Sequence, residues 1–245
     1  MILANHGIVS SSGGLLPSTL LTNLYAVYNA ELNANDSLST YNGTAQGGLT
    51  YSSGISGNAF TFNGTNAYVS LPNDSLNSTV GNDFSISLWV NFTSTSNQGL
   101  ITNFTNPSVN IYTGWDLRLI SGLPTFNLWN NSESPVIVQG SSISVNNWYH
   151  IVITRKKGSR SRIYMNGSLV QSNSNTSDPI ISSTYYPNIG HFQYLSTNGA
   201  NTATYHGLYM ASGSKIDSVN IWTKELTTDE VTQLYNSGNG VQYPF

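Results

Sequence analysis

The sequence contains no cysteine and few charged residues. The absence of cysteine excludes a disulfide framework and a thiolate metal site. Charged residues are 8% of the 245 residues, and the net charge of −3 excludes the generally basic surface of a nucleic-acid-binding protein. The low charge does not predict disorder, because 15 Tyr, 8 Phe and 5 Trp are present and disordered chains are poor in aromatic residues. We therefore expect a folded protein whose surface is hydrated by Asn, Ser, Thr and Gly.

Long apolar runs are also absent, and no stretch is long enough to span a membrane. The first residues carry no Lys or Arg, and their apolar stretches are broken at residues 10–14 and at Pro17, so they do not resemble a secretory signal. Residues 1–22 are rich in Gly and Ser. Two interpretations stay open: a frayed tail or peripheral strand, or a docking anchor that orders against another protein. The sequence thus divides into this N-terminal segment and one domain over residues 23–245.

Short apolar runs separated by turns fill most of the domain. The clearest covers residues 84–92, where five apolar residues alternate on one face and Trp89 lies on the other. Residues 148–154 and 162–165 predict a hairpin, and Asn166-Gly167 predicts a tight turn into a further strand at 169–172. Other expected strands cover 25–28, 59–62, 67–71, 99–104, 116–120, 125–129 and 136–139. Strands at this spacing predict a sandwich or barrel.

One short helix is expected near the C-terminus. Thr227 and Glu230 have the spacing of a capping box, in which each side chain bonds the backbone N–H of the other residue. The apolar residues that follow share one helical face, and Gly238 is a candidate stop.

Five segments in order resemble a known family. They are FTFNGTNAYVSLP at 60–72, DFSISLWV at 83–90, NWYHIVI at 147–153 with RIYMNGSLV at 162–170, GSKIDSVNIW at 213–222, and KELTTDEVTQLY at 224–235. Together they resemble the laminin-G-like jelly-roll domain of the concanavalin A-like lectin/glucanase superfamily, over about residues 24–238. The resemblance implies an all-β fold, a two-sheet antiparallel jelly-roll sandwich with one short C-terminal helix. It also implies a concave face that relatives use to bind glycans or proteins.

Catalysis is not expected. Hydrolytic relatives place two carboxylates on one strand, and no Glu-x-Asp or Glu-x-Glu pair occurs in this sequence. The resemblance implies that calcium is a conceivable cofactor, with Asp36, Asn63 and Asp217 as its ligands. The alternative, which we favour, is that such lone residues fix turns and that no cofactor is bound.

Aromatic residues near strand ends and in the long stretch 172–213 are the candidates for sugar binding, because sugar faces stack on aromatic rings while polar groups bond the hydroxyls. The candidate ligand-binding residues are Trp115, Asp116, Arg118, Trp129, Asn131, Tyr185, Tyr186, His191 and Tyr194. For Trp115 and Trp129, packing in the core is an equal alternative. Five of the eight cations fall between residues 155 and 162, which predicts either an anion-binding hairpin tip or a solvated edge.

These features favour a non-catalytic binding module. We expect a virion-associated structural protein of a bacteriophage, in the capsid or tail, that displays a glycan-binding lectin-like domain. Its partners would be surface glycans, other virion structural proteins and further copies of itself, with no nucleic acid and no membrane. A purely structural capsid decoration protein is one alternative. A bacterial surface lectin domain, located outside the cell, is another.

Overall fold

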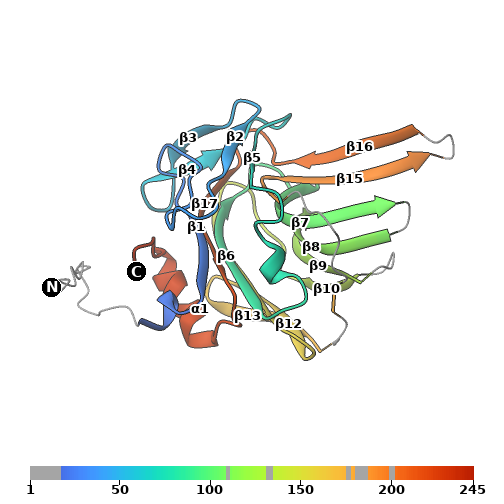
Figure 1. Cartoon of the computed structure of the whole chain (residues 1–245). Helices are drawn as coiled ribbons and strands as arrows, with labels where there is room; N and C mark the ends of the chain where they lie inside the picture. Colours follow the sequence, from blue (N-terminus) through green and yellow to red (C-terminus); the bar gives the residue numbers. More distant parts are fainter. Residues whose placement is uncertain (1–17, 109–110, 131–134, 175–177, 180–186, 199–201) are drawn as a thin grey trace.

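A computed structural model describes residues 18–108, 111–130, 135–174, 178–179, 187–198 and 202–245 (Figure 1). Two antiparallel sheets form the body of the molecule. The eight-stranded sheet has the order β13-β12-β11-β6-β17-β4-β3, with β1 also paired to β17. Its strands are β1 (Leu24–Tyr28), β3 (Thr50–Ser53), β4 (Asn58–Thr61), β6 (Phe84–Asn91), β11 (Trp148–Lys156), β12 (Arg160–Met165), β13 (Ser168–Asn173) and β17 (Lys215–Trp222).

The seven-stranded sheet has the order β10-β9-β8-β7-β14-β5-β2. Its strands are β2 (Thr44–Gln46), β5 (Tyr68–Ser70), β7 (Gln98–Ser108), β8 (Ile111–Ile120), β9 (Leu123–Asn130), β10 (Val136–Gln139) and β14 (Asn188–Ile189). A separate hairpin is formed by β15 (His191–Asn198) and β16 (Thr202–Tyr209). The helices are η1 (Ser18–Leu21), η2 (Asn77–Thr79), α1 (Thr228–Tyr235) and η3 (Asn236–Gly238). Within the described residues, no helix is long and apolar enough to cross a membrane.

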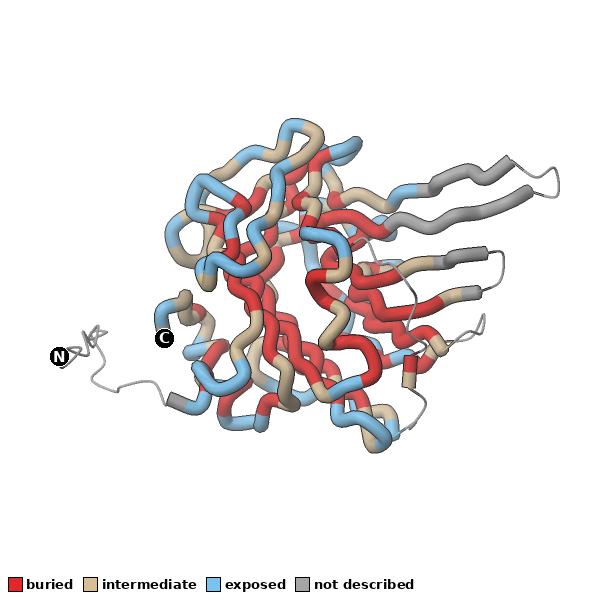
Figure 2. Tube along the Cα trace, in the orientation of Figure 1, coloured by how far each residue is buried: buried red, intermediate tan, exposed pale blue. Residues whose placement is uncertain are grey.

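The core lies between the inner faces of the two sheets. In β6, the alternating residues from Phe84 to Val90, continued by Phe92 beyond the strand, are fully buried in it, as the period-2 pattern predicts. The facing sheet contributes Trp115, Leu117 and Leu119 from β8. Figure 2 shows this buried layer as the red strands at the centre of the molecule. Burial of this apolar surface, at about 25 cal/mol per Å², is the main force that joins the sheets.

The outer face of the eight-stranded sheet is covered by α1 and the N-terminal turn. Thr227 and Glu230 form the expected capping box, and Glu230 also bonds Lys224 at 2.6 Å. The helix ends at Tyr235, and Asn236 rather than Gly238 takes the left-handed conformation after it. Asn is one of the few residues other than Gly that adopts this conformation readily.

Residues 18–22 belong to the sandwich, which corrects the expected boundary at residue 23. Leu20 is fully buried beside Val231 and Leu234 of α1, and its carbonyl accepts a 2.7 Å bond from Trp222 Nε1. Residues 1–17 lie outside the described part, so their proposed role as an anchor stays a prediction.

The expected basic hairpin tip is largely neutralised by acids that are distant in the sequence. Arg155 is fully buried and pairs with Asp178, and Lys156 pairs with Asp83 at 2.5 Å. Glu225 accepts two bonds from Arg160, at 2.9 and 3.0 Å, and lies 3.6 Å from Arg162. Four of the five cations are therefore held in ion pairs, which argues against a free anion-binding surface at the β11–β12 turn.

The hairpin β15–β16 projects beside the end of the β7–β8 hairpin, at the right of Figure 1. The sequence pattern did not predict it. A glycine allows its close approach: a Cβ added to Gly99 of β7 would lie 2.2 Å from the Phe192 nitrogen and 2.5 Å from the His191 carbonyl carbon. Only a residue without a side chain fits between these two backbones.

Replacement of Gly99 by Ala is expected to separate β15 from β7 and to lower the free energy of unfolding by about 1–3 kcal/mol, because the methyl group meets backbone atoms that cannot turn aside. Urea unfolding measures this change. Gly158→Ala is the control: its added methyl group meets no atom within 4 Å, so only its left-handed backbone, with φ of +62°, opposes the change. A loss no larger than in the control would show that the close approach is unimportant.

Candidate functional site

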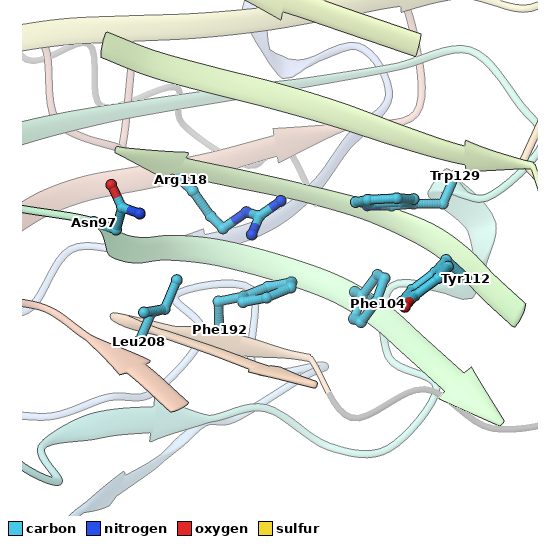
Figure 3. A pocket seen from close by; sticks show the side chains of 7 residues that line it. All are labelled: Asn97, Phe104, Tyr112, Arg118, Trp129, Phe192 and Leu208. Carbon is cyan, nitrogen blue, oxygen red and sulfur yellow. The ribbon is translucent and has the colours of Figure 1, made fainter. Parts of the chain in front are cut away.

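A cavity of about 540 Å³ lies between the outer face of the seven-stranded sheet and the root of the β15–β16 hairpin (Figure 3). Its lining is mainly aromatic and comes from five separate segments of the chain. The lining residues are Asn97, Phe104, Tyr112, Arg118, Trp129, Phe192 and Leu208. This is a usual size for a small-ligand site, and a mostly apolar wall with a few polar groups is the usual composition.

Four aromatic rings pack together at one end of the cavity. The Phe104 ring lies 5.7 Å from the Trp129 ring and 5.0 Å from the Phe192 ring, and the Tyr112 ring lies 5.2 Å from the Trp129 ring. Gly114 is the residue of β8 that pairs with both Phe104 of β7 and Trp129 of β9. Since Gly114 has no side chain, the two rings can meet above it. Its φ of +89° also requires glycine.

Asp116 organises the polar side of the cavity. It is completely buried, and its Oδ1 accepts bonds from Asn127 Nδ2 at 2.7 Å and from Arg118 Nε at 2.5 Å. Its Oδ2 accepts a 2.5 Å bond from Trp129 Nε1. One carboxylate thus fixes both the indole ring and the guanidinium group that line the cavity.

Arg118 is held from a second side by an aromatic ring. Its Cζ lies 4.1 Å from the centre of the Phe192 ring, which is cation–π geometry. Figure 3 shows the guanidinium group extending along the cavity toward Trp129, with Phe192 beside it. Strand β8 presents Asp116 and Arg118 on the same outer face because they are two residues apart.

The structure brings three of the sequence-predicted residues together, namely Asp116, Arg118 and Trp129. Trp115 does not belong to this group, which corrects that prediction. It points to the opposite side of β8, is fully buried, and donates a 2.8 Å bond to Thr79 Oγ1. The cause is again the period of 2, which places neighbouring strand residues on opposite faces.

His191 is also separated from the cavity. It follows the same rule, because its neighbour Phe192 faces the cavity and His191 faces away. Its ring stacks on Tyr209 at 4.2 Å and lies 5.2 Å from the ring of Tyr68. The side chain is 3% exposed, and neither ring nitrogen has a hydrogen-bond partner among the described residues. Burial lowers the pKa of His191 to about 4.

The structure does not test the remaining ligand-binding candidates. Asn131, Tyr185 and Tyr186 lie outside the described residues, and although Tyr194 falls in β15, its side chain lies outside them too. Their roles stay predictions.

The three candidate calcium ligands are all engaged by nearby donors. Asp36 accepts bonds from four backbone N–H groups between residues 27 and 41, the shortest at 2.9 Å. Asn63 Oδ1 accepts three backbone bonds from residues 65–67. Asp217 accepts bonds from Ile55 and Ser56, and burial raises its pKa to about 6. Among the described residues, no three His, Asp or Glu side chains group together as a metal site would require.

Sequence reasoning missed five residues of the lining: Asn97, Phe104, Tyr112, Phe192 and Leu208. Tyr112 had a usable signal, because it shares the outer face of β8 with Asp116 and Arg118 at even spacing. Phe192 and Leu208 had none, since their hairpin reaches the cavity only through the tertiary fold.

A family model described as the concanavalin A-like lectin/glucanases superfamily matches residues 63–232. The chain belongs to this superfamily. The resemblance of the five sequence segments is thereby confirmed, as is the jelly-roll sandwich. Among curated proteins, botulinum neurotoxin type X of Clostridium botulinum is 27% identical over 168 residues, which are 63% of this chain and 11% of the toxin.

Several solved domains share the fold of this chain at low sequence identity. The binding domain of Paraclostridial Mosquitocidal Protein 1 matches with a TM-score of 0.67 and 21% identity, over 89% of this chain and 53% of that one. The binding domain of botulinum neurotoxin DC in complex with SialylT matches with a TM-score of 0.63 and 19% identity, over 89% of this chain and 52% of that one. Domain 4 of the extracellular arabinanase AbnA of Geobacillus stearothermophilus, in complex with arabinotriose, matches with a TM-score of 0.60 and 20% identity. The match covers 86% of this chain and 97% of that one.

The span of these matches differs. The present chain corresponds to about half of each toxin binding domain and to nearly all of the arabinanase domain. All three solved structures are binding domains or a domain with a bound sugar, and at these identities the likeness shows the fold alone.

Asp116→Ala is expected to lower the free energy of unfolding by about 2–4 kcal/mol, because three buried donors lose their acceptor and Arg118 loses its counter-charge. Chemical denaturation measures the loss. Asp229→Ala, at an exposed position in the first turn of α1, is the matched control and should cost about 0.5 kcal/mol. Equal losses in the two variants would contradict the role given to Asp116.

The pKa of His191 predicts acid sensitivity. Because its folded pKa of about 4 is below the ordinary value of 6.5, the unfolded chain binds more protons between these values. The stability that depends on neutral His191 is complete above pH 6.5 and is lost as the pH falls toward 4. His191→Phe keeps an aromatic ring against Tyr209 and should reduce this loss by about 1–3 kcal/mol.

Unfolding free energies of the two proteins at pH 7 and pH 4.5 test this expectation. His150, whose pKa burial lowers to about 3, remains in both proteins and contributes the same background. An unchanged pH dependence in His191→Phe would refute the assignment.

Proposed function

We propose that the chain is a non-catalytic module that binds a glycan in the cavity between β7, β8, β9 and the β15–β16 hairpin. The observation that carries the proposal is the pairing of aromatic walls with one fixed guanidinium group. The C–H face of a sugar ring packs on Tyr112 or Trp129, and the Nη groups of Arg118, which no described residue bonds, donate to the sugar's oxygens. A rigid site of this kind loses little entropy when the ligand binds.

The state of Asp116 supports a binding role over a catalytic one. Hydrolysis of a glycosidic bond commonly uses two carboxylates, about 5–10 Å apart and accessible to the substrate. Asp116 is the one acidic residue that the described residues place beside the cavity, and it is buried and bonded to three donors. Its contacts suit a residue that positions others.

The solved structures with bound sugars support the same reading. The domain from the arabinanase was determined with arabinotriose, and a neurotoxin binding domain with SialylT. Both share the sandwich with this chain, although neither identity is high enough to transfer a ligand.

The biological setting is a separate part of the proposal. We infer a place on a bacteriophage capsid or tail from the weakly charged, Asn- and Thr-rich composition, with a display of the cavity toward the host surface. Detection of the chain in purified particles would support this setting, and its presence only in secreted bacterial fractions would replace it with a surface lectin.

A glycan array probed with the whole chain should give binding signals. Tyr112→Ala should lower the affinity for the bound glycan about tenfold, because a loss of about 1.4 kcal/mol of ring stacking corresponds to that factor. Tyr112 is half-buried and its removal leaves the core intact. Calorimetric titration of the best array ligand measures the effect.

Tyr51→Ala is the matched control for this experiment. Tyr51 is likewise half-buried, but it lies on β3 of the other sheet. Its replacement should leave the affinity unchanged. Absence of binding to any glycan, or equal losses in both variants, would argue against the cavity as a glycan site.

A further inference from the structure

The cavity combines an apolar wall with polar side chains that offer more hydrogen-bond donors than acceptors. Arg118 is a donor without any acceptor atom. Asn97, at a second polar position, uses one lone pair of Oδ1 to accept a 2.9 Å bond from the Ser121 backbone, so its Nδ2 donor and one lone pair of Oδ1 are left for a ligand. Both oxygens of Asp116 are already occupied and buried.

A ligand must therefore supply acceptors. A sugar hydroxyl group carries a proton that needs an acceptor of its own, and the lining side chains offer it only the Tyr112 hydroxyl and the second lone pair of Asn97 Oδ1. A carboxylate has four acceptor positions and no proton to place. The balance of donors thus favours a ligand with a carboxylate group.

The orientation of Arg118 supports the same conclusion. Its Nε donates a bond to Asp116 and its face rests on the Phe192 ring, and these two contacts fix the orientation of the guanidinium plane. No described residue accepts a bond from its two Nη groups. These groups form a planar pair of donors, which matches the two oxygens of a carboxylate better than it matches a single hydroxyl group.

The charges are arranged so that the ion pair still attracts an anion. Asp116 neutralises Arg118 in total charge, but it lies beneath the cavity while the guanidinium group lines it. A carboxylate bonded to Nη is closer to the positive group than to the negative one. Attraction between such close charges is strong where aromatic rings exclude water.

The geometry points to an acidic sugar as the ligand, a sialic or uronic acid whose carboxylate is held by Arg118 while its ring packs against Trp129 and Tyr112. This assignment rests on the proposed function and names the class of glycan for the same cavity. Arg118 is then the residue that determines specificity, and Asp116 is the residue that positions it.

The test compares sugars that differ only at the carboxyl group. Methyl glycosides of N-acetylneuraminic acid and of glucuronic acid are titrated into the whole chain, each beside its carboxyl-reduced counterpart, with ligand-observed NMR or calorimetry as the readout. At least one acid should bind about tenfold or more tightly than its reduced form. This is the range expected for a pair of charge-assisted hydrogen bonds. Glucose 6-sulfate is included as an anion of different shape and should bind more weakly than the acid.

Variants link the preference to Arg118. Arg118→Lys keeps the charge beside Asp116 and so protects the fold, but it lacks the planar pair of donors and should lose most of the preference for the acid. Arg160→Lys is the matched control, because Arg160 also makes a two-bond pair with a carboxylate, Glu225, on the other sheet. The Arg160→Lys variant should prefer the acid over its reduced form as strongly as the unaltered chain does.

The outcomes separate the two proposals. Equal binding of acids and reduced sugars, or a preference that survives in Arg118→Lys, would overturn the acidic-sugar assignment and leave the glycan site standing. Equal binding of sulfate and carboxylate would also overturn it, in favour of a general anion site. No binding of any sugar would remove both proposals.

Discussion

Burial of the two inner sheet faces against each other is the constraint on which every other feature of this molecule depends. Each strand has one side committed to the core, so its other side is free for different contacts. In β8 the committed side is Trp115, Leu117 and Leu119, and the free side presents Asp116 and Arg118. The cavity is thus a consequence of core packing, because the register that turns one set of residues into the core must turn the other set to the outer face.

The two outer faces of the sandwich are covered in different ways. The eight-stranded sheet is covered by α1 and by the turn around Leu20, whose apolar residues pack on Val152 and Trp222. The seven-stranded sheet receives the root of the β15–β16 hairpin, which leaves a cavity lined by aromatic rings. This covering hairpin is what places the candidate site on the seven-stranded sheet.

Polar groups buried in the molecule mostly fix geometry. Asp36 holds a turn through backbone N–H groups, and Asp116 holds an indole and a guanidinium group. A buried carboxylate without such partners would be costly, so each is placed where several donors converge. Arg155 of the β11–β12 hairpin follows the same rule, since it is fully buried and pairs with Asp178.

The sequence by itself determined the family, the alternating strands, the capped helix and the shared face of Asp116 and Arg118. These are local properties: a period of 2 or 3.6 residues, a capping box, a turn at Asn166-Gly167. Only the tertiary structure decided that Trp115 is core while Trp129 lines a cavity, and that Phe192 and Leu208 join it. The reason is that a pattern shows which residues share a face but not which face is buried, and a distant hairpin leaves no trace in the sequence of the strands it covers.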